Sequence, residues 1–237
     1  MIDLNCDLGE GLDNEHLLMP LISSCNIACG GHAGSVETID RVIELAKEHN
    51  VKIGAHPSFP DRENFGRKVM DISDDELQES LEEQLQLFRE RVELLKAEVH
   101  HIKPHGALYN LIAVNQEKAT IVVEVIQNVF DQMKIYVPCN SVIEKVAQES
   151  GLEIVYEAFA DRNYNDNLTL VSRSFPFAVI TDKEKVVAHV KRMANESVVK
   201  TVQDSIKPIK AETFCVHGDN KKAIDILEYL HQNLEVK

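Results

Sequence analysis

The chain alternates between short apolar runs and longer stretches in which apolar residues recur every three or four positions. Short apolar runs are typical of buried strands, and the longer spacing is typical of helices with one buried face. The longest such stripe consists of Leu77, Leu81, Leu85, Phe88, Val92 and Leu95. Ser73 and Glu76 precede it in the register of a capping box, which predicts that a long helix begins after Ser73.

The same periodicity predicts five further helices. They run from Val36 to Ala46, near Glu117–Met133, from about Asn140 to Ser150, from Thr181 onward, and from near Asn220 through Leu230. Glu184 lies three residues after Thr181, as in a second capping box. Gly151 is suited to end the helix before it, because glycine readily adopts the left-handed conformation of a helix C-terminus.

Seven candidate strands lie between these helices: Met1–Cys6, Ser24–Ala28, Val51–Ala55, His100–Lys103, Lys134–Pro138, Glu153–Ala158 and Thr213–Val216. Strands that alternate with helices predict a parallel sheet, which either closes into a barrel or stays open. Residues 161–210 depart from the alternation, with a polar loop, a possible strand at Phe177–Ile180 and a helix. We predict one α/β domain over residues 1–237, with an insertion at about 161–210.

Polar residues follow nearly every predicted strand. They include Asp7, Glu10, His32, His56, Lys103, His105, Glu157, Asp161, Arg162, His217 and Asp219. A single histidine after a strand is usually a loop residue with a satisfied hydrogen bond. A β/α barrel, however, gathers all the C-terminal strand ends around one axis, whereas an open sheet binds ligands at one switch point. We therefore predict a barrel of about seven parallel strands with its active site on that face.

Lys103 closes a strand at a position where a barrel interior would remove it from water. A buried lysine either pairs with a carboxylate or loses its proton more readily. Asp7 and Glu157 are the carboxylates that could pair with it.

Composition and charge narrow the function. Hydrophobic residues make up 44% of the 237 residues, enough for a full core, and 25 basic against 39 acidic residues give a net charge of −14. This charge disfavours binding to nucleic acid or to anionic membranes. Residues 1–7 lack the features of a signal peptide, and no window reaches the ~18 apolar residues of a membrane span. We expect a soluble, cytoplasmic protein.

Several site types are not expected. The five cysteines are odd in number and have no zinc-finger or CxxC spacing, so we expect small buried residues in a reducing compartment. No GxxxxGK[ST] or GxGxxG phosphate loop, GxSxG elbow or HExxH motif occurs.

A set of ordered motifs resembles the LamB/YcsF family, the A subunits of bacterial 5-oxoprolinases. The matching segments are DLNCDLGEG from Asp3, NIACG from Asn26 with HAG from His32, GAHP from Gly54, FGR from Phe65, KPHGALYN from Lys103, EAFADR from Glu157 and VHGDN from Val216. They span nearly the whole chain. The chain departs from the family pattern at Gly31, where an aromatic is usual, at Ser35, where an acid is usual, and in a shorter loop between Gly11 and Leu18.

The resemblance implies a barrel similar to the glycoside hydrolase/deacetylase type. It also implies two partner subunits, B and C, and the ATP-driven opening of 5-oxo-L-proline to L-glutamate, with ATP as co-substrate. Such a reaction needs a base for water, a cation for anionic oxygen and an acid for the leaving nitrogen.

We assign these roles to the residues at the strand ends. The predicted catalytic set is Asp7, Glu10, His56, Lys103, His105, Glu157 and His217, and the predicted substrate-binding set is Asn26, His32, Asp161, Arg162 and Asp219. Asp7 or Glu157 is the expected base, Lys103 the cation and His105 the acid. Arg162 would anchor the substrate carboxylate, and Asp219 would orient His217.

Two alternatives stay open. A metal-dependent deacetylase or amidohydrolase could hold a divalent ion with Asp7, His32, His56 and His217. A non-catalytic component could instead bind 5-oxoproline and deliver it to its partners, although the density of ionisable groups favours chemistry.

Overall fold

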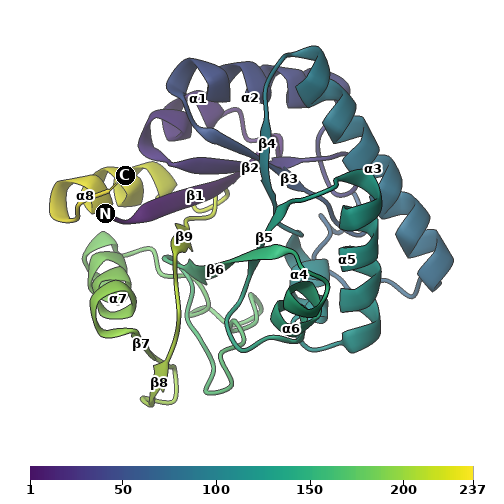
Figure 1. Cartoon of the computed structure of the whole chain (residues 1–237). Coiled ribbons are helices and arrows are strands. Elements are labelled where there is room, and N and C mark those ends of the chain that lie inside the picture. Colours follow the sequence, from purple (N-terminus) through teal and green to yellow (C-terminus); the bar gives the residue numbers. More distant parts are fainter. Residues whose placement is uncertain (237) are drawn as a thin grey trace.

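Seven parallel strands form a closed barrel, seen in a computed structural model that describes residues 1–236 (Figure 1). The barrel strands are β1 (Asp3–Leu8), β2 (Ser24–Ala28), β3 (Lys52–His56), β4 (Val99–Ile102), β5 (Lys134–Val137), β6 (Glu153–Phe159) and β9 (Thr213–Cys215). They pair in chain order, and β9 closes the ring between β6 and β1. The barrel predicted from the alternation of strands and helices is confirmed.

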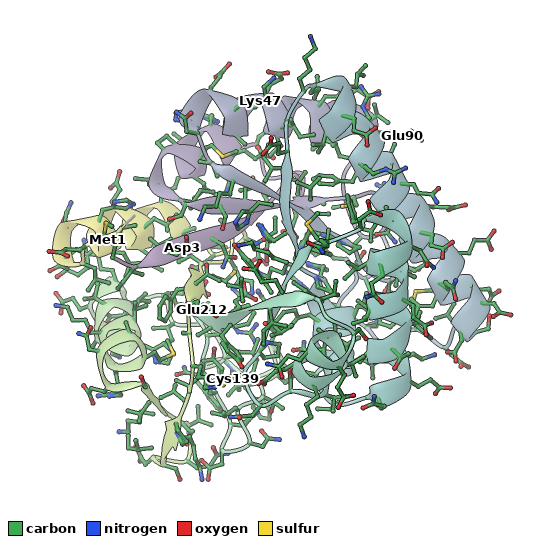
Figure 2. The ribbon with its side chains drawn as sticks, in the orientation of Figure 1. Met1, Asp3, Lys47, Glu90, Cys139 and Glu212 are labelled. Carbon is green, nitrogen blue, oxygen red and sulfur yellow. The ribbon has the colours of Figure 1, made fainter. Side chains whose placement is uncertain are left out.

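Helices surround the barrel and cover its outer face (Figure 1). They are α1 (Glu15–Leu18), α2 (Val36–His49), α3 (Asp74–Leu94), α4 (Gly106–Ile112), α5 (Gln116–Val129), α6 (Val142–Glu149), α7 (Lys183–Glu196) and α8 (Ala223–Asn233), with a 3-10 turn at Met19–Leu21. Their buried faces pack on the strands in one apolar core. The charged side chains of the outer helices, such as Lys47 and Glu90, point away from the barrel (Figure 2).

Local sequence explains where several helices begin. Ser73 and Glu76 form the predicted capping box at the start of α3. Ser35 caps α2 by accepting a hydrogen bond from the backbone of Thr38. The predicted cap of α7 is wrong by one residue, because the Asp182 carboxylate, and not Thr181, accepts the first backbone N–H groups.

The segment between β6 and β9 contains a loop, α7 and an antiparallel hairpin that the sequence did not predict. The hairpin strands are β7 (Val198–Lys200) and β8 (Ile206–Pro208), which pair beside α7 and outside the barrel (Figure 1). The strand predicted at Phe177–Ile180 reduces to a single bridge between Val179 and Arg162. The loop from 160 to 182 nevertheless matters for the site, because it covers one side of the barrel mouth.

Candidate active site

The polar residues predicted at the strand ends meet in one cavity at the C-terminal end of the barrel. The cavity has a volume of about 1050 Å³. Its lining includes Asp7, Glu10, His56, Lys103, His105, Glu157, Arg162, His217 and Asp219. Three predicted residues, Asn26, His32 and Asp161, do not line it and instead support residues that do.

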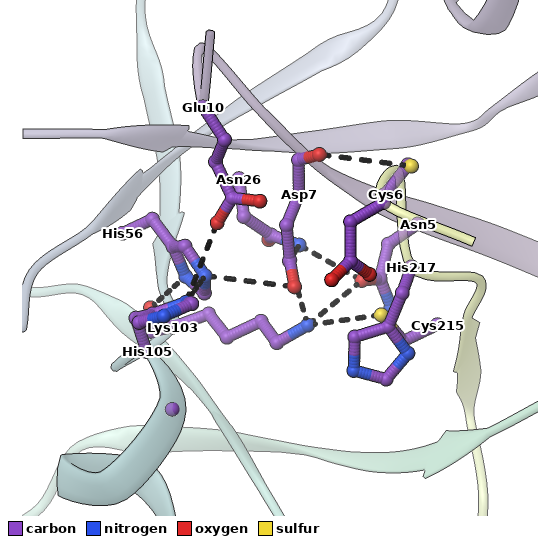
Figure 3. A network of polar contacts seen from close by, with 12 residues as sticks. Asn5, Cys6, Asp7, Glu10, Asn26, His56, Lys103, His105, Cys215 and His217 are labelled. Atoms are coloured by element: carbon purple, nitrogen blue, oxygen red, sulfur yellow. Dashed lines mark hydrogen bonds and ion pairs between the residues drawn. The ribbon is translucent and has the colours of Figure 1, made fainter. Parts of the chain in front are cut away.

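Lys103 lies at the centre of the cavity floor, between two carboxylates (Figure 3). Its Nζ is 2.9 Å from Asp7 Oδ1, 2.8 Å from Glu157 Oε1 and 3.2 Å from Cys215 Sγ. The side chain is 2% exposed. Burial favours the neutral amine, but the attraction of Asp7, Cys215 and Glu157 outweighs it and raises the lysine pKa. Of the two states the sequence allowed, the structure selects the paired cation.

A row of residues across four neighbouring strands holds Asp7 in place. Asp7, Asn26, Gly54 and His101 are register partners along β1, β2, β3 and β4. Asn26 donates to Asp7 Oδ1 at 2.8 Å, and its own oxygen lies 2.7 Å from Nε2 of His101. Gly54 makes room for this imidazole, since a Cβ there would lie 2.2 Å from it. Asn26 is fully buried beneath Asp7 and therefore positions a carboxylate, rather than contacting a ligand.

His56 and His105 together hold one proton more than two neutral imidazoles. Nδ1 of His56 lies 2.6 Å from the carbonyl oxygen of Lys103, and Nε2 of His105 lies 2.9 Å from that of Phe65. Both outer nitrogens must donate, because a carbonyl oxygen only accepts. The inner nitrogens lie 2.9 Å apart and need a further proton between them. Burial lowers the pKa of His105. Nε2 of His56 also lies 3.5 Å from Asp7 Oδ2.

Glu10 lies beside this histidine pair and has an unusual proton affinity. Burial and the nearby charge of Asp7 raise the pKa of Glu10 from 4.5 to about 7. Its Oε1 is 3.0 Å from Nε2 of His32 and 3.4 Å from Nδ1 of His105. Burial lowers the pKa of His32 to about 2, so this imidazole stays neutral and donates to Glu10. A carboxyl group of this kind gains and loses its proton near neutral pH.

His217 faces the cavity from the opposite side and is held by an acid. Its Nδ1 lies 2.8 Å from Asp161 Oδ1, and Asn220 donates to the second oxygen of Asp161 at 2.9 Å. The bond fixes the proton on Nδ1 and leaves Nε2 as an acceptor. Asp219, which the sequence assigned to orienting His217, instead pairs with two arginines. The predicted role therefore falls to Asp161, which lies farther from His217 in sequence.

Arg162 is a buried cation without a carboxylate partner among residues 1–236. Its guanidinium donates to the backbone oxygens of Val171 at 2.6 Å and Ala178 at 3.2 Å. Burial, reinforced by the charge of Arg173, lowers its pKa to about 10. The side chain lines the cavity and is only 6% exposed. A buried positive charge of this kind is stabilised by an anionic ligand.

Two clusters of side chains in residues 1–236 have ligand atoms within 4.8 Å of one another. They are Glu10, His32, His56 and His105, and Asp7, Cys215 and His217. The four metal ligands considered from the sequence are divided between the clusters, two in each. In the first cluster, the rings of His32 and His105 are parallel with centroids 3.6 Å apart. Lone pairs of parallel rings do not converge, so one ring would have to turn before all four groups could hold one ion.

Sequence reasoning missed three groups of functional interest. His101 shares the inward face of its strand with Lys103, two residues on, and this alternation was its available signal. Arg67 and Arg173 come from loops, where no periodicity marks the direction of a side chain. Arg67 belongs to the FGR motif, which could have drawn attention to it.

Comparison with known proteins agrees with this fold. The model of the LamB/YcsF family matches residues 2–237. The chain belongs to the LamB/YcsF family. A 5-oxoprolinase A subunit from Pyrococcus abyssi is 41% identical, with 99% of this chain and 94% of the relative aligned. One from Bacillus cytotoxicus is 37% identical, with 99% and 95% aligned.

One solved structure resembles this LamB/YcsF chain over its whole length, and a second shares its fold. The "lactam utilization protein" of Thermus thermophilus superposes with a TM-score of 0.90 at 33% identity, covering 100% of this chain and 98% of the other. A GH113 β-1,4-mannanase superposes with a TM-score of 0.55 at 12% identity over 98% of both chains, which shows a shared fold alone. No helix within residues 1–236 is long and apolar enough to span a membrane.

Proposed function

We propose that this chain is the A component of an ATP-dependent 5-oxoprolinase and that its barrel opens the lactam ring of 5-oxo-L-proline to give L-glutamate. The names of its relatives, two 5-oxoprolinase A subunits and a "lactam utilization protein", support the substrate. The arrangement around Lys103 supports a catalytic role. It places a buried cation between a proton acceptor, His217, and a protonated pair, His56 and His105.

The first role is the activation of water. His217 is the better base, because Asp161 keeps its Nε2 free of a proton toward the cavity. The sequence had suggested Asp7 or Glu157. Burial raises the pKa of Asp7, but the charges of His56 and Lys103 outweigh it and hold the pKa well below its usual value. Asp7 is therefore a poor proton acceptor near neutral pH and serves to hold the two cations.

The second role is to stabilise charge and expel the amine. Lys103 offsets negative charge that develops on the oxygen contributed by the attacking water. The His56–His105 pair supplies a proton to the ring nitrogen as the carbon–nitrogen bond breaks, and Glu10 returns one to the pair. Arg162 binds the substrate carboxylate, which supplies the negative charge that this buried guanidinium lacks.

ATP supplies the driving force because a five-membered lactam is a poor electrophile. The amide oxygen takes the γ-phosphoryl group of ATP, ADP leaves, and the ring carbon becomes a better electrophile. Water adds to that carbon and loses a proton to His217, and the carbon–nitrogen bond breaks with its electron pair on nitrogen. The acyl phosphate that remains takes up a second water to give glutamate and phosphate. This chain lacks a standard phosphate-loop sequence, so we assign ATP binding to partner subunits B and C.

Glutamate release from 5-oxoproline and ATP tests the proposal. We expect release from the complex of this chain with its B and C subunits, and none from the chain alone. Lys103→Met should lower the rate by about 10²- to 10³-fold in the complex, as losses of oxyanion-stabilising groups do. Lys52→Met is the control, because Lys52 pairs with Asp3 at the opposite end of the barrel. A folded complex that releases no glutamate would contradict the assignment.

A metal-dependent amidohydrolase is the second candidate, carried by the cluster of Glu10 and the three histidines. Protein purified without chelator would then contain about one equivalent of a transition metal. Loss of the bound metal in the Glu10→Gln variant would support this function. Metal-free protein with full activity in the complex would contradict it.

A further inference from the structure

Positive charge gathers in the cavity of a chain that is otherwise strongly acidic. The wall holds five cationic side chains, Arg67, Lys68, Lys103, Arg162 and Arg173, against four carboxylates, Asp7, Glu10, Glu157 and Asp219. The deep part contains three of these carboxylates. The mouth has the opposite balance: Arg67, Lys68 and Arg173 are exposed there, and Asp219 pairs with the two arginines. A mouth of this charge attracts an anion.

The arrangement of the mouth charges is specific. Arg67, from the loop after β3, donates to Asp219 Oδ2. Arg173, from the loop after β6, binds both oxygens of the same carboxylate, at 3.2 and 3.4 Å. Two guanidinium groups from distant parts of the chain thus meet on one carboxylate, and one positive charge remains. The ring of Phe65 lies 4.8 Å from the Arg67 guanidinium and steadies it.

We propose that Arg67 and Arg173 form a phosphoryl-binding subsite at the cavity mouth, so that the ligand of this chain is the O-phosphorylated lactam and not the free lactam. This inference rests on the proposed function. Paired guanidinium groups match the geometry of a phosphoryl group, and a charge of about −1.5 to −2 competes well with one carboxylate. Asp219 holds the two arginines together until the ligand arrives.

The dimensions and charges of the cavity fit this ligand. A volume of about 1050 Å³ is at the upper end for drug-sized ligands and far more than a lactam ring with one carboxylate requires. Such a ring would occupy only the floor, between Lys103 and Arg162. Asp219 follows His217 by two residues, so a phosphoryl group at the mouth would lie beside the proposed base. A phosphorylated lactam has two anionic groups, and the cavity offers a separate cationic position for each.

Titration calorimetry of the purified chain with inorganic phosphate tests the subsite. We expect millimolar binding by the wild type, and at least tenfold weaker binding by Arg67→Gln and by Arg173→Gln, about the loss of one charge-assisted contact. Asp219→Asn should bind phosphate severalfold more tightly, since it removes the competing carboxylate. The controls are Arg91→Gln and Asp40→Asn. Arg91 and Asp40 form a comparable ion pair, 2.6 Å long, on the surface outside the cavity.

The outcomes separate this inference from the proposed function. Phosphate binding that is absent, or that falls equally in the Arg91 control, would overturn the subsite. Phosphate binding that depends on both arginines supports the subsite even if the complex releases no glutamate. Absence of glutamate release would count only against the lactam as the substrate. In an active complex, Arg173→Gln should release phosphate in excess of glutamate, because the activated lactam is not retained. Equal release of the two would contradict the proposed ligand.

Discussion

The Asp161 carboxylate lies 2.8 Å from Nδ1 of His217, although Asp219 is much closer to His217 in sequence. Asp161 is fully buried, and Asn220 donates to its second oxygen. Burial raises the pKa of Asp161, but His217 and these donors outweigh it and leave the pKa below its usual value. The acid is therefore charged at neutral pH and controls the tautomer of the imidazole.

Replacing Asp161 should impair the base without weakening substrate binding. We expect Asp161→Asn to lower kcat by about 10³- to 10⁴-fold with little change in KM, as when an imidazole loses its orienting acid. Ring ¹⁵N NMR shifts of His217 should show a changed tautomer in this variant and the wild-type tautomer in Asp219→Asn. An Asp161→Asn complex with near-normal kcat would remove the dyad from the mechanism.

Removing Lys103 should cost stability as well as activity. Lys103→Met leaves Asp7 and Glu157 buried without their cation, which should lower the free energy of unfolding by about 3–5 kcal/mol. Lys103→Met/Glu157→Gln removes one of the two charges and should recover part of that loss. Urea denaturation measures both variants. If the double variant is less stable than the single one, the pairing does not dominate the energetics of the cavity floor.

Glu10 should make stability depend on pH in a defined direction. Its pKa is about 7 in the folded chain against an ordinary 4.5, so the folded state holds this proton more tightly than the unfolded state. The stability it contributes is complete below about pH 4.5 and is lost as the pH rises through 7. The glutamine in Glu10→Gln does not titrate. The free energy of unfolding of this variant, relative to that of the wild type, should therefore rise by up to about 3 kcal/mol between pH 5 and pH 8.

Denaturation of wild type and Glu10→Gln at several pH values, with chelator present, measures this difference. A gap that stays constant from pH 5 to pH 8 would show that Glu10 titrates at its ordinary pKa. The proposed exchange of a proton between Glu10 and His105 would then lose its support.

Gly31 and Gln84 should behave as a coupled pair. A Cβ at Gly31 would lie 2.4 Å from Gln84 Oε1 and 2.5 Å from Ser58 Oγ. Gln84 thus fills the space beside Gly31. We expect Gly31→Ala to destabilise the protein by about 1–3 kcal/mol, the usual cost of overpacking.

Adding Gln84→Ala should relieve the collision at Gly31, so the double variant should lose less stability than the sum of the single changes. Gln78→Ala is the control, because Gln78 lies on the same helix but bonds to Glu82. Additive losses for Gly31 and Gln84 would contradict the coupling.

Much of the fold follows from local patterns in the sequence. The apolar stripe from Leu77 to Val92 specifies α3, because burial of one helix face fixes its period, and Ser73 fixes its start. The strand at Ser24–Ala28 was predicted to the residue. The hairpin of β7 and β8 was not, since its three-residue strands are partly exposed and show no period. Short, half-exposed elements depend on their neighbours and leave little trace in hydropathy.

By itself the sequence determined that strands and helices alternate along this chain and that its ionisable residues follow the strands, because periodicity and strand ends are local properties. Only the tertiary structure decided the partners of those residues. Lys103 lies between Asp7 and Glu157, His56 shares a proton with His105, and Asp161 replaces Asp219 beside His217. These pairs join positions up to about a hundred residues apart along the chain. Their proton affinities arise from burial and from neighbouring charge, which exist only once the barrel has closed.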